Sequence, residues 1–161
     1  MNKVKIVSVK GHEIIDSRGT PTVFCEICFS DGTKGEASVP SGASTGKFEA
    51  CELRDKDSRF GGKGVATAIN NINDIIAPYI VGKSIMPQNE LDGILLEADG
   101  SENKSRLGAN AILAVSLAYA RGCAKVYSIP LYRYIGGICG NTMPVPMMNI
   151  LNGGAHAANN I

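Results

Sequence analysis

A run of small residues from Ser41 to Gly46, followed by Lys47, is the first place where residue types suggest chemistry. Glycines followed by a lysine are typical of loops that bind nucleotide phosphates. Here only three residues separate Gly42 from Gly46, and Phe48 stands where such a loop needs a Ser or Thr for magnesium. The spacing therefore argues against a nucleotide P-loop.

Two interpretations of this small-residue segment remain, a plain flexible turn and a mobile lid. The composition favours the plain turn, because small residues cannot pack a core and are typical of surface loops. The interpretation as a lid also remains, because the segment carries hydroxyl groups, and a hard cation accepts hydroxyl and carbonyl oxygens as ligands. The members of the segment are Ser41, Gly42, Ala43, Ser44, Thr45 and Gly46.

A second glycine-rich stretch, from Asn152 to Ala157, carries His156. A histidine on such a loop after an apolar run could be catalytic or could contact a phosphate. An exposed loop histidine without a role is the commoner case for an isolated sequence. The other histidine, His12, lies in the first strand region, and we interpret it as structural.

The cysteines do not indicate a metal site. Cys25 and Cys28 have CxxC spacing, but within a strand residues three apart point to opposite faces, and no second pair follows. The total of five scattered cysteines is typical of reduced thiols in a cytosolic protein.

Scattered acidic residues could supply a carboxylate pair or metal ligands, but their spacing fixes no geometry. The run from Glu52 to Asp57 alternates in charge and is most simply predicted to be a solvated face. The acidic candidates are Asp16, Glu36, Glu49, Glu52 and Asp55.

Composition excludes several classes of protein. The 161 residues are 44% hydrophobic and 19% charged, as in one globular domain. A net charge of +1 provides no basic field for nucleic acid. The longest apolar stretch, Ala109 to Ala120, is shorter than the roughly 20 residues that span a bilayer. We therefore expect a cytoplasmic protein with neither a nucleic-acid nor a membrane partner.

The first third of the chain is predicted to form a three-stranded antiparallel meander. Apolar and polar residues alternate over residues 4–9, and further strands are indicated from Thr22 to about Phe29 and from Thr33 to Ser38. The dipeptide Asp31-Gly32 is a strong hairpin signal between the last two strands.

About four helices should follow, so the order of elements predicts an α+β fold with helices on one face of the sheet. Apolar spacing and Pro or Gly boundaries place them at residues 65–80, 87–99, 109–125 and 130–136. The apolar run from Met147 to Leu151 is then predicted to be a buried strand. We expect a domain over residues 1–140 and the start of a second one over residues 141–161.

Five stretches together resemble the N-terminal part of the enolases. They cover essentially the whole chain in the family's order. The stretches are residues 15–23 (IDSRGTPTV), 38–46 (SVPSGASTG), 52–55 (ELRD), 102–113 (ENKSRLGANAIL) and 144–157, which begins PVP and ends LNGGAHA.

The resemblance implies a meander and helices that cap a larger β/α barrel, of which this chain has only the start. It implies the reversible dehydration of 2-phospho-D-glycerate to phosphoenolpyruvate with Mg²⁺. Ser41 would ligate the second magnesium through side-chain and backbone oxygens when the segment closes, and His156 would contact substrate near its phosphate. The family's acid, base and metal carboxylates correspond to positions beyond Ile161, so no catalytic residue is carried over.

The family also implies a homo-oligomer, a dimer or a larger assembly. Where the family often has arginine and glutamate in interface ion pairs, this chain has His12 and Phe24. The chain could be a fragment, the product of an incomplete gene model or a genuinely short relative, and it is expected to be inactive alone. The alternative is a stand-alone, non-catalytic interaction module.

Overall fold

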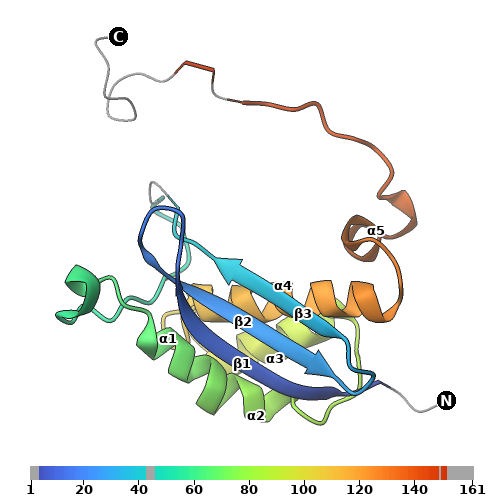
Figure 1. Cartoon of the computed structure of the whole chain (residues 1–161), viewed down its shortest axis with the longest axis horizontal. Helices are drawn as coiled ribbons and strands as arrows, with labels where there is room; N and C mark the ends of the chain where they lie inside the picture. Colours follow the sequence, from blue (N-terminus) through green and yellow to red (C-terminus); the bar gives the residue numbers. More distant parts are fainter. Residues whose placement is uncertain (1–3, 43–45, 149, 152–161) are drawn as a thin grey trace.

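The computed structural model describes residues 4–42, 46–148 and 150–151. Its sheet has three antiparallel strands in the order β1-β2-β3 (Figure 1): β1 (Ile6–Ile15), β2 (Pro21–Phe29) and β3 (Lys34–Val39). The predicted meander is therefore confirmed. Strand β1 continues to Ile15, whereas the alternating pattern indicated only residues 4–9.

The hairpin between β2 and β3 forms at the predicted dipeptide. Gly32 has a φ of +86°, a conformation that glycine adopts without steric cost. The carboxylate of Asp31 accepts a hydrogen bond from the Thr33 amide at 2.9 Å. The local residue types therefore fix this turn.

The predicted helix over residues 65–80 is one rod with an irregular centre. It consists of α1 (Ala66–Asn70), a π-helical segment η2 (Asn71–Ile76) and α2 (Ala77–Ile80). The backbone amide of Gly11 donates to the side-chain oxygen of Asn73 at 2.8 Å. The side-chain amide of Asn73 donates in return to the Gly11 carbonyl at 3.3 Å. This widened turn therefore also covers part of the free edge of β1.

The other predicted helices form close to their expected bounds. They are α3 (Gln88–Asp99), α4 (Ala109–Val126) and α5 (Leu131–Gly136). Two short 3-10 segments, η1 (Arg59–Gly62) and η3 (Gly137–Cys139), were not predicted.

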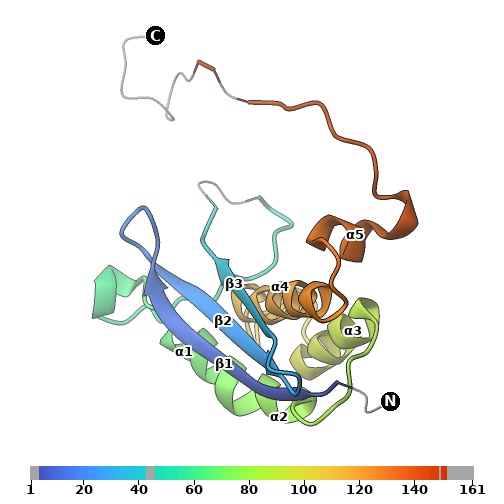
Figure 2. The same ribbon diagram turned by 45° about the vertical axis from the view of Figure 1, so that its right-hand side comes forward.

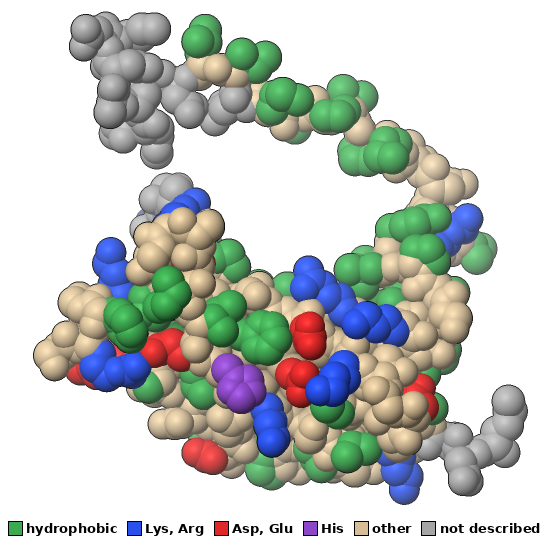
Figure 3. All heavy atoms as spheres, in the orientation of Figure 1, with side chains coloured by type: hydrophobic (Ala, Val, Ile, Leu, Met, Phe, Trp, Pro, Cys, Tyr) green, Lys and Arg blue, Asp and Glu red, His purple; other side chains and the backbone are tan. Residues whose placement is uncertain are grey.

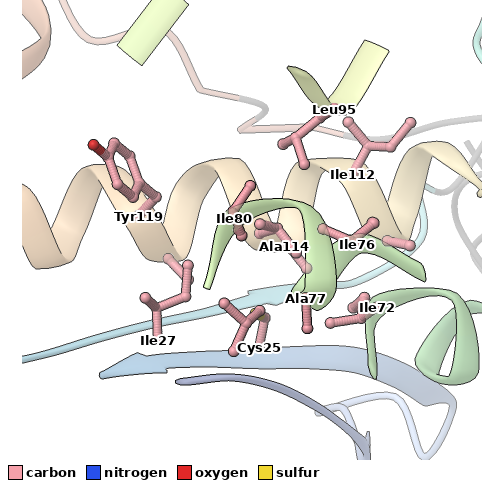
Figure 4. Close-up of a cluster of buried hydrophobic side chains, with 14 of the residues drawn as sticks. Cys25, Ile27, Ile72, Ile76, Ala77, Ile80, Leu95, Ile112, Ala114 and Tyr119 are labelled. Carbon is pink, nitrogen blue, oxygen red and sulfur yellow. The ribbon is translucent and has the colours of Figure 1, made fainter. Parts of the chain in front are cut away.

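The helices lie on one face of the sheet, which confirms the α+β class (Figures 1 and 2). Between the layers, β2 contributes Cys25 and Ile27, the η2 segment contributes Ile72 and Ile76, and Tyr119 belongs to α4 (Figure 4). All five side chains are fully buried. Burial raises the pKa of the Cys25 thiol to about 12, so this cysteine is an inert core residue.

Helix α4 approaches β3 closely at a pair of glycines. A Cβ atom on Gly35 would lie 2.0 Å from the carbonyl oxygen of Ala118, and one on Gly122 would lie 2.2 Å from the Phe29 ring. The same helix reaches the outer edge of β3. There Arg121 donates to the Glu36 carbonyl at 2.9 Å, and the Lys125 ammonium donates to the Lys34 carbonyl at 2.8 Å.

The opposite face of the sheet bears a mixture of hydrophobic, acidic and basic side chains (Figure 3). His12 and Phe24 are directly paired across β1 and β2, with ring centroids 6.3 Å apart. Cys28 also lies on this face, opposite to buried Cys25, as the strand periodicity predicted.

The described residues after η3 lead away from the sheet and helices (Figure 2). Residues 141–148 have neither helix nor strand structure. The prediction of a buried strand from Met147 to Leu151 is wrong for the described residues, since Met147 is 96% exposed and Leu151 82%. A strand needs a neighbour for its backbone hydrogen bonds, and this stretch has none among the described residues.

No single helix within the described ranges is long and apolar enough to cross a membrane. Helix α4 and the α5–η3 segment (Leu131–Cys139) reach that length and composition only when they are taken together, and the chain bends by 102° between them.

Candidate functional site

The small-residue segment begins directly after β3, and its first residue is held by two charged side chains. The Ser41 hydroxyl donates to Glu52 Oε1 at 2.6 Å and accepts a hydrogen bond from Arg54 Nη2. Ser41 and Gly42 are described, and the segment ends at Gly46, whose carbonyl accepts from the Glu49 amide at 3.2 Å. Ala43, Ser44 and Thr45 lie outside the described residues.

Arg54 joins three parts of the chain at this point. Its Nη1 donates to the carbonyl of Pro21 at 2.6 Å and to that of Lys63 at 2.5 Å, while its Nη2 reaches Ser41. It also forms an ion pair with Glu52 at 2.7 Å. The Arg54 side chain is only 16% exposed. The planar guanidinium group, with its five donors, suits such a junction better than a lysine would.

An open cavity of about 450 Å³ lies beside this junction. Two of its lining residues are in contact, since Arg18 Nη1 donates a hydrogen bond to the Ser41 carbonyl oxygen at 3.5 Å. Basic side chains outnumber acidic ones in the lining, so the cavity attracts anions more readily than cations. The lining residues are Asp16, Arg18, Thr20, Ser41, Gly42, Arg54 and Lys63.

Asp16 shapes the turn that presents Arg18 to the cavity. Its carboxylate accepts hydrogen bonds from the amides of Thr20 at 2.9 Å and Arg18 at 2.8 Å. These bonds, that from Thr20 foremost, lower the pKa of Asp16. The carboxylate therefore stays ionised and is engaged by the backbone of its own turn.

The charged run from Glu52 to Asp57 is not simply a solvated face, which corrects the prediction. Asp55 is 6% exposed, and its carboxylate accepts from the amides of Ala66 and Thr67, both at 2.8 Å, at the start of α1. Burial acts to raise the pKa of Asp55, but these hydrogen bonds outweigh it and lower the pKa. The run therefore ties helix α1 and the small-residue segment to the sheet.

The described residues do not assemble the side chains of a metal centre. Within residues 4–42, 46–148 and 150–151, no group of three or more His, Cys, Asp or Glu side chains could hold a metal ion. The hydroxyl of Ser41 accepts a hydrogen bond from a guanidinium group, which disfavours a cation at the same oxygen. These residues therefore do not fit a magnesium ion by themselves.

The structure brings together only some of the predicted site residues. Ser41 and Gly42 line the cavity, while Glu36 lies on the outer face of the sheet and Glu49 lies near a separate hollow beside Lys104. His156 lies outside the described residues. Sequence reasoning missed Arg54, whose signal was the ELRD stretch that carries the family resemblance.

Comparison with known proteins identifies the family. The family model described as "Enolase, N-terminal domain" matches residues 6–135. A curated enolase from Methanopyrus kandleri is 58% identical over 157 residues, which are 98% of this chain. The chain belongs to the enolase N-terminal domain family. It spans 37% of the length of that relative.

Proposed function

We propose that this chain is the N-terminal part of an enolase that reversibly dehydrates 2-phospho-D-glycerate to phosphoenolpyruvate in glycolysis. The observation that carries the proposal is the 58% identity to the Methanopyrus kandleri enolase over nearly the whole chain. The cavity beside Ser41, with its basic lining, suits an anionic substrate of this kind.

The reaction explains why a small-residue segment would be useful. Removing a proton next to a carboxylate places a second negative charge on an anion, and divalent cations such as Mg²⁺ offset this charge. The effect is larger when water is excluded, which requires a closing loop. The segment from Ser41 to Gly46 is proposed as that loop. Ser41 is proposed to contribute a metal ligand when the segment closes, which requires its hydroxyl to release the Arg54 guanidinium group. His156 is proposed to contact the substrate near its phosphate.

The chain by itself is proposed to be catalytically silent, because it spans 37% of the length of its relative. The family resemblance also assigns the acid and the base to none of its residues. The test is an assay of the purified chain for Mg²⁺-dependent formation of phosphoenolpyruvate, with Ser41→Ala and His156→Ala as controls. Turnover clearly above both variants would contradict the silence. A longer product of the same gene, if it exists, should show the activity, and its failure to do so would contradict the proposed reaction.

A stand-alone interaction module is the second candidate, and an apolar surface favours it. Ile138, Met143, Val145 and Met147 are each at least 86% exposed, and such a surface normally contacts a partner. Size-exclusion chromatography with thermal unfolding separates the candidates. A soluble monomer that unfolds cooperatively supports the module, and aggregation supports a fragment that lacks its covering domain.

The full protein is proposed to be a cytoplasmic homo-oligomer. The family resemblance supports this proposal, and it places His12 and Phe24, which are paired across β1 and β2, where the family has interface ion pairs. Because this chain lacks those charges, the usual contact is either absent or repacked around Phe24. Here an aromatic contact would replace the usual ion pairs. Equilibrium sedimentation of the full protein and of its Phe24→Ala variant, which removes the aromatic contact without restoring the family's glutamate, would test whether this face carries the interface.

A further inference from the structure

Helix α5 is attached to the rest of the molecule by very few side chains. It packs mainly against α4 and lies away from the sheet (Figure 2). None of its residues is buried, and Leu131 and Tyr134 are its half-buried ones. Tyr132 and Ile135 on the same helix are 59% and 66% exposed. The docking of α5 therefore depends largely on Tyr134, which contacts the hydrophobic core.

The hydroxyl of Tyr134 meets a chain of polar groups that belongs to α3 and α4. It donates to Gln88 Oε1 at 3.3 Å. The side-chain amide of Gln88 donates to Asp92 Oδ1 at 3.2 Å and to Ser116 Oγ at 3.1 Å, and the Ser116 hydroxyl donates to Asp92 Oδ1 at 2.7 Å. The bond from Tyr134 is the longest of the four. The bonds between α3 and α4 can therefore stay intact when α5 leaves.

The ring of Tyr134 is loosely held on its other side. It stacks on Tyr127 with ring centroids 6.3 Å apart, and Tyr127 is itself 55% exposed. A hollow of about 350 Å³ borders both rings and the segment from Ile85 to Gln88. Open space beside a side chain means that few atoms attract it from that side.

The end of α4 is closed without help from α5. The amide of Ser128, whose φ is +55°, donates to the Lys125 carbonyl, and the amide of Ile129 donates to the Ala124 carbonyl, both at 2.9 Å. This pair of bonds is a common closure of helix C-termini. Helix α5 has six residues, too few to persist as a helix in water by itself. A movement after Ile129 would therefore leave α4 intact and let α5 unwind.

We propose that α5 is a strap that opens as one unit about residues 128–130, with Tyr134 as its latch, while the sheet and the other helices stay folded. Cys123 on α4 is fully buried, and Tyr134 lies beside its thiol, so opening of the strap uncovers this cysteine. Local opening is expected where a segment has few buried contacts. Opening also redirects the residues after α5 relative to the sheet. The strap is independent of the proposed reaction.

Alkylation of the 161-residue chain with iodoacetamide, read for each cysteine by mass spectrometry, tests the strap. Cys25 is the internal reference, because it is fully buried between the sheet and the helices and becomes accessible only on global unfolding (Figure 4). Without denaturant, Cys123 should react at least about tenfold faster than Cys25, since opening of α5 breaks far fewer contacts than global unfolding does.

Two variants of the latch sharpen the test. Tyr134→Ala should raise the rate at Cys123 by about a further tenfold and leave the rate at Cys25 within about twofold. Tyr134→Phe keeps the ring over the thiol and removes only the hydroxyl, so it should raise the rate at Cys123 by about threefold. Tyr132→Ala is the matched control, because Tyr132 is an exposed tyrosine on the same helix, and it should change neither rate.

The strap is overturned if Cys123 and Cys25 react at equal rates in the parent chain, because global unfolding would then expose both. It is also overturned if Tyr134→Phe leaves the rate at Cys123 unchanged, or if Tyr134→Ala accelerates both cysteines equally. No turnover is measured, so a failure of the strap and a failure of the proposed reaction are distinguishable.

Discussion

The centre of the charged run from Glu52 to Asp57 and the apolar stretch from Met143 to Leu151 lie in environments opposite to those that their composition suggests. In the charged run, the Arg54 and Asp55 side chains are 16% and 6% exposed. In the apolar stretch, Met147 is 96% exposed. Polarity alone therefore does not decide which residues are buried.

The difference between the two regions lies in the partners that each one has. The donors of Arg54 meet backbone carbonyls, and the carboxylate of Asp55 meets the free amides of a helix start, so their burial leaves no polar group unsatisfied. The apolar stretch has no surface to pack against among the described residues. A residue is buried when its groups find partners, and those partners come from distant parts of the chain.

The largest effect should come from matched truncations of two apolar side chains. Leu95 lies on α3 and is fully buried in the hydrophobic core, whereas Met147 is almost fully exposed. Leu95→Ala should lower the free energy of unfolding by about 3 kcal/mol, because it leaves a cavity. Met147→Ala should change it by less than about 0.5 kcal/mol. Urea unfolding measures both, and equal losses would contradict the comparison.

The next effect concerns the charged run itself. Asp55→Ala removes the acceptor of two helix amides and should lower the free energy of unfolding by about 2 kcal/mol. Glu97→Ala is the matched control, since Glu97 is an exposed carboxylate on α3 and should cost almost nothing. If both variants unfold at the same urea concentration, the run is only a solvated face after all.

Acid should weaken the fold through carboxylates of this kind. Hydrogen bonds lower the pKa of Asp55, and they lower that of buried Asp99 in spite of its burial. Their stabilising contribution is complete above the unfolded-state pKa of about 4 and is lost as the pH falls through the lower native values. Urea midpoints measured from pH 6 to pH 2 should therefore drop below about pH 4. An Asp99→Asn variant should show a shallower drop, and an identical pH profile would argue against this origin.

The smallest effect is expected from removing the apolar stretch altogether. A chain that ends at Gly140 keeps every element of the sheet and helix layers. Its thermal midpoint should match that of the 161-residue chain within a few degrees, because the described residues of the removed stretch, 141–148 and 150–151, are exposed, and exposed residues contribute little to stability. A clear loss of stability would show that residues 141–161 belong to the folded domain, and it would contradict the domain boundary predicted after residue 140.

Local signals were enough to predict the sheet and most of the helices. The turn at Asp31-Gly32 and the left-handed Gly100 after α3 follow from residue types at single positions. The extension of β1 to Ile15 was missed, because Gly11 and His12 interrupt the alternating pattern while the pairing with β2 continues through them. The π-helical turn could not be predicted either, since Asn73 bonds a strand 62 residues away.

The candidate site was predictable only in part. The composition of the small-residue segment singled out Ser41, but its partner Arg54 acts through carbonyls 33 residues earlier and 9 residues later. Charge patterns carry no information on such distant partners. The same limit explains the wrong strand from Met147 to Leu151, because apolarity predicts burial only if a covering surface is present.

The bonds from α4 to the outer edge of β3 have a consequence for how copies of this chain can meet. Arg121 and Lys125 occupy the carbonyls of Glu36 and Lys34, which are the groups that an incoming strand would need. With these two carbonyls occupied, the edge is a poorer template for a strand of another molecule. The two bonds therefore disfavour strand-by-strand polymerisation at β3.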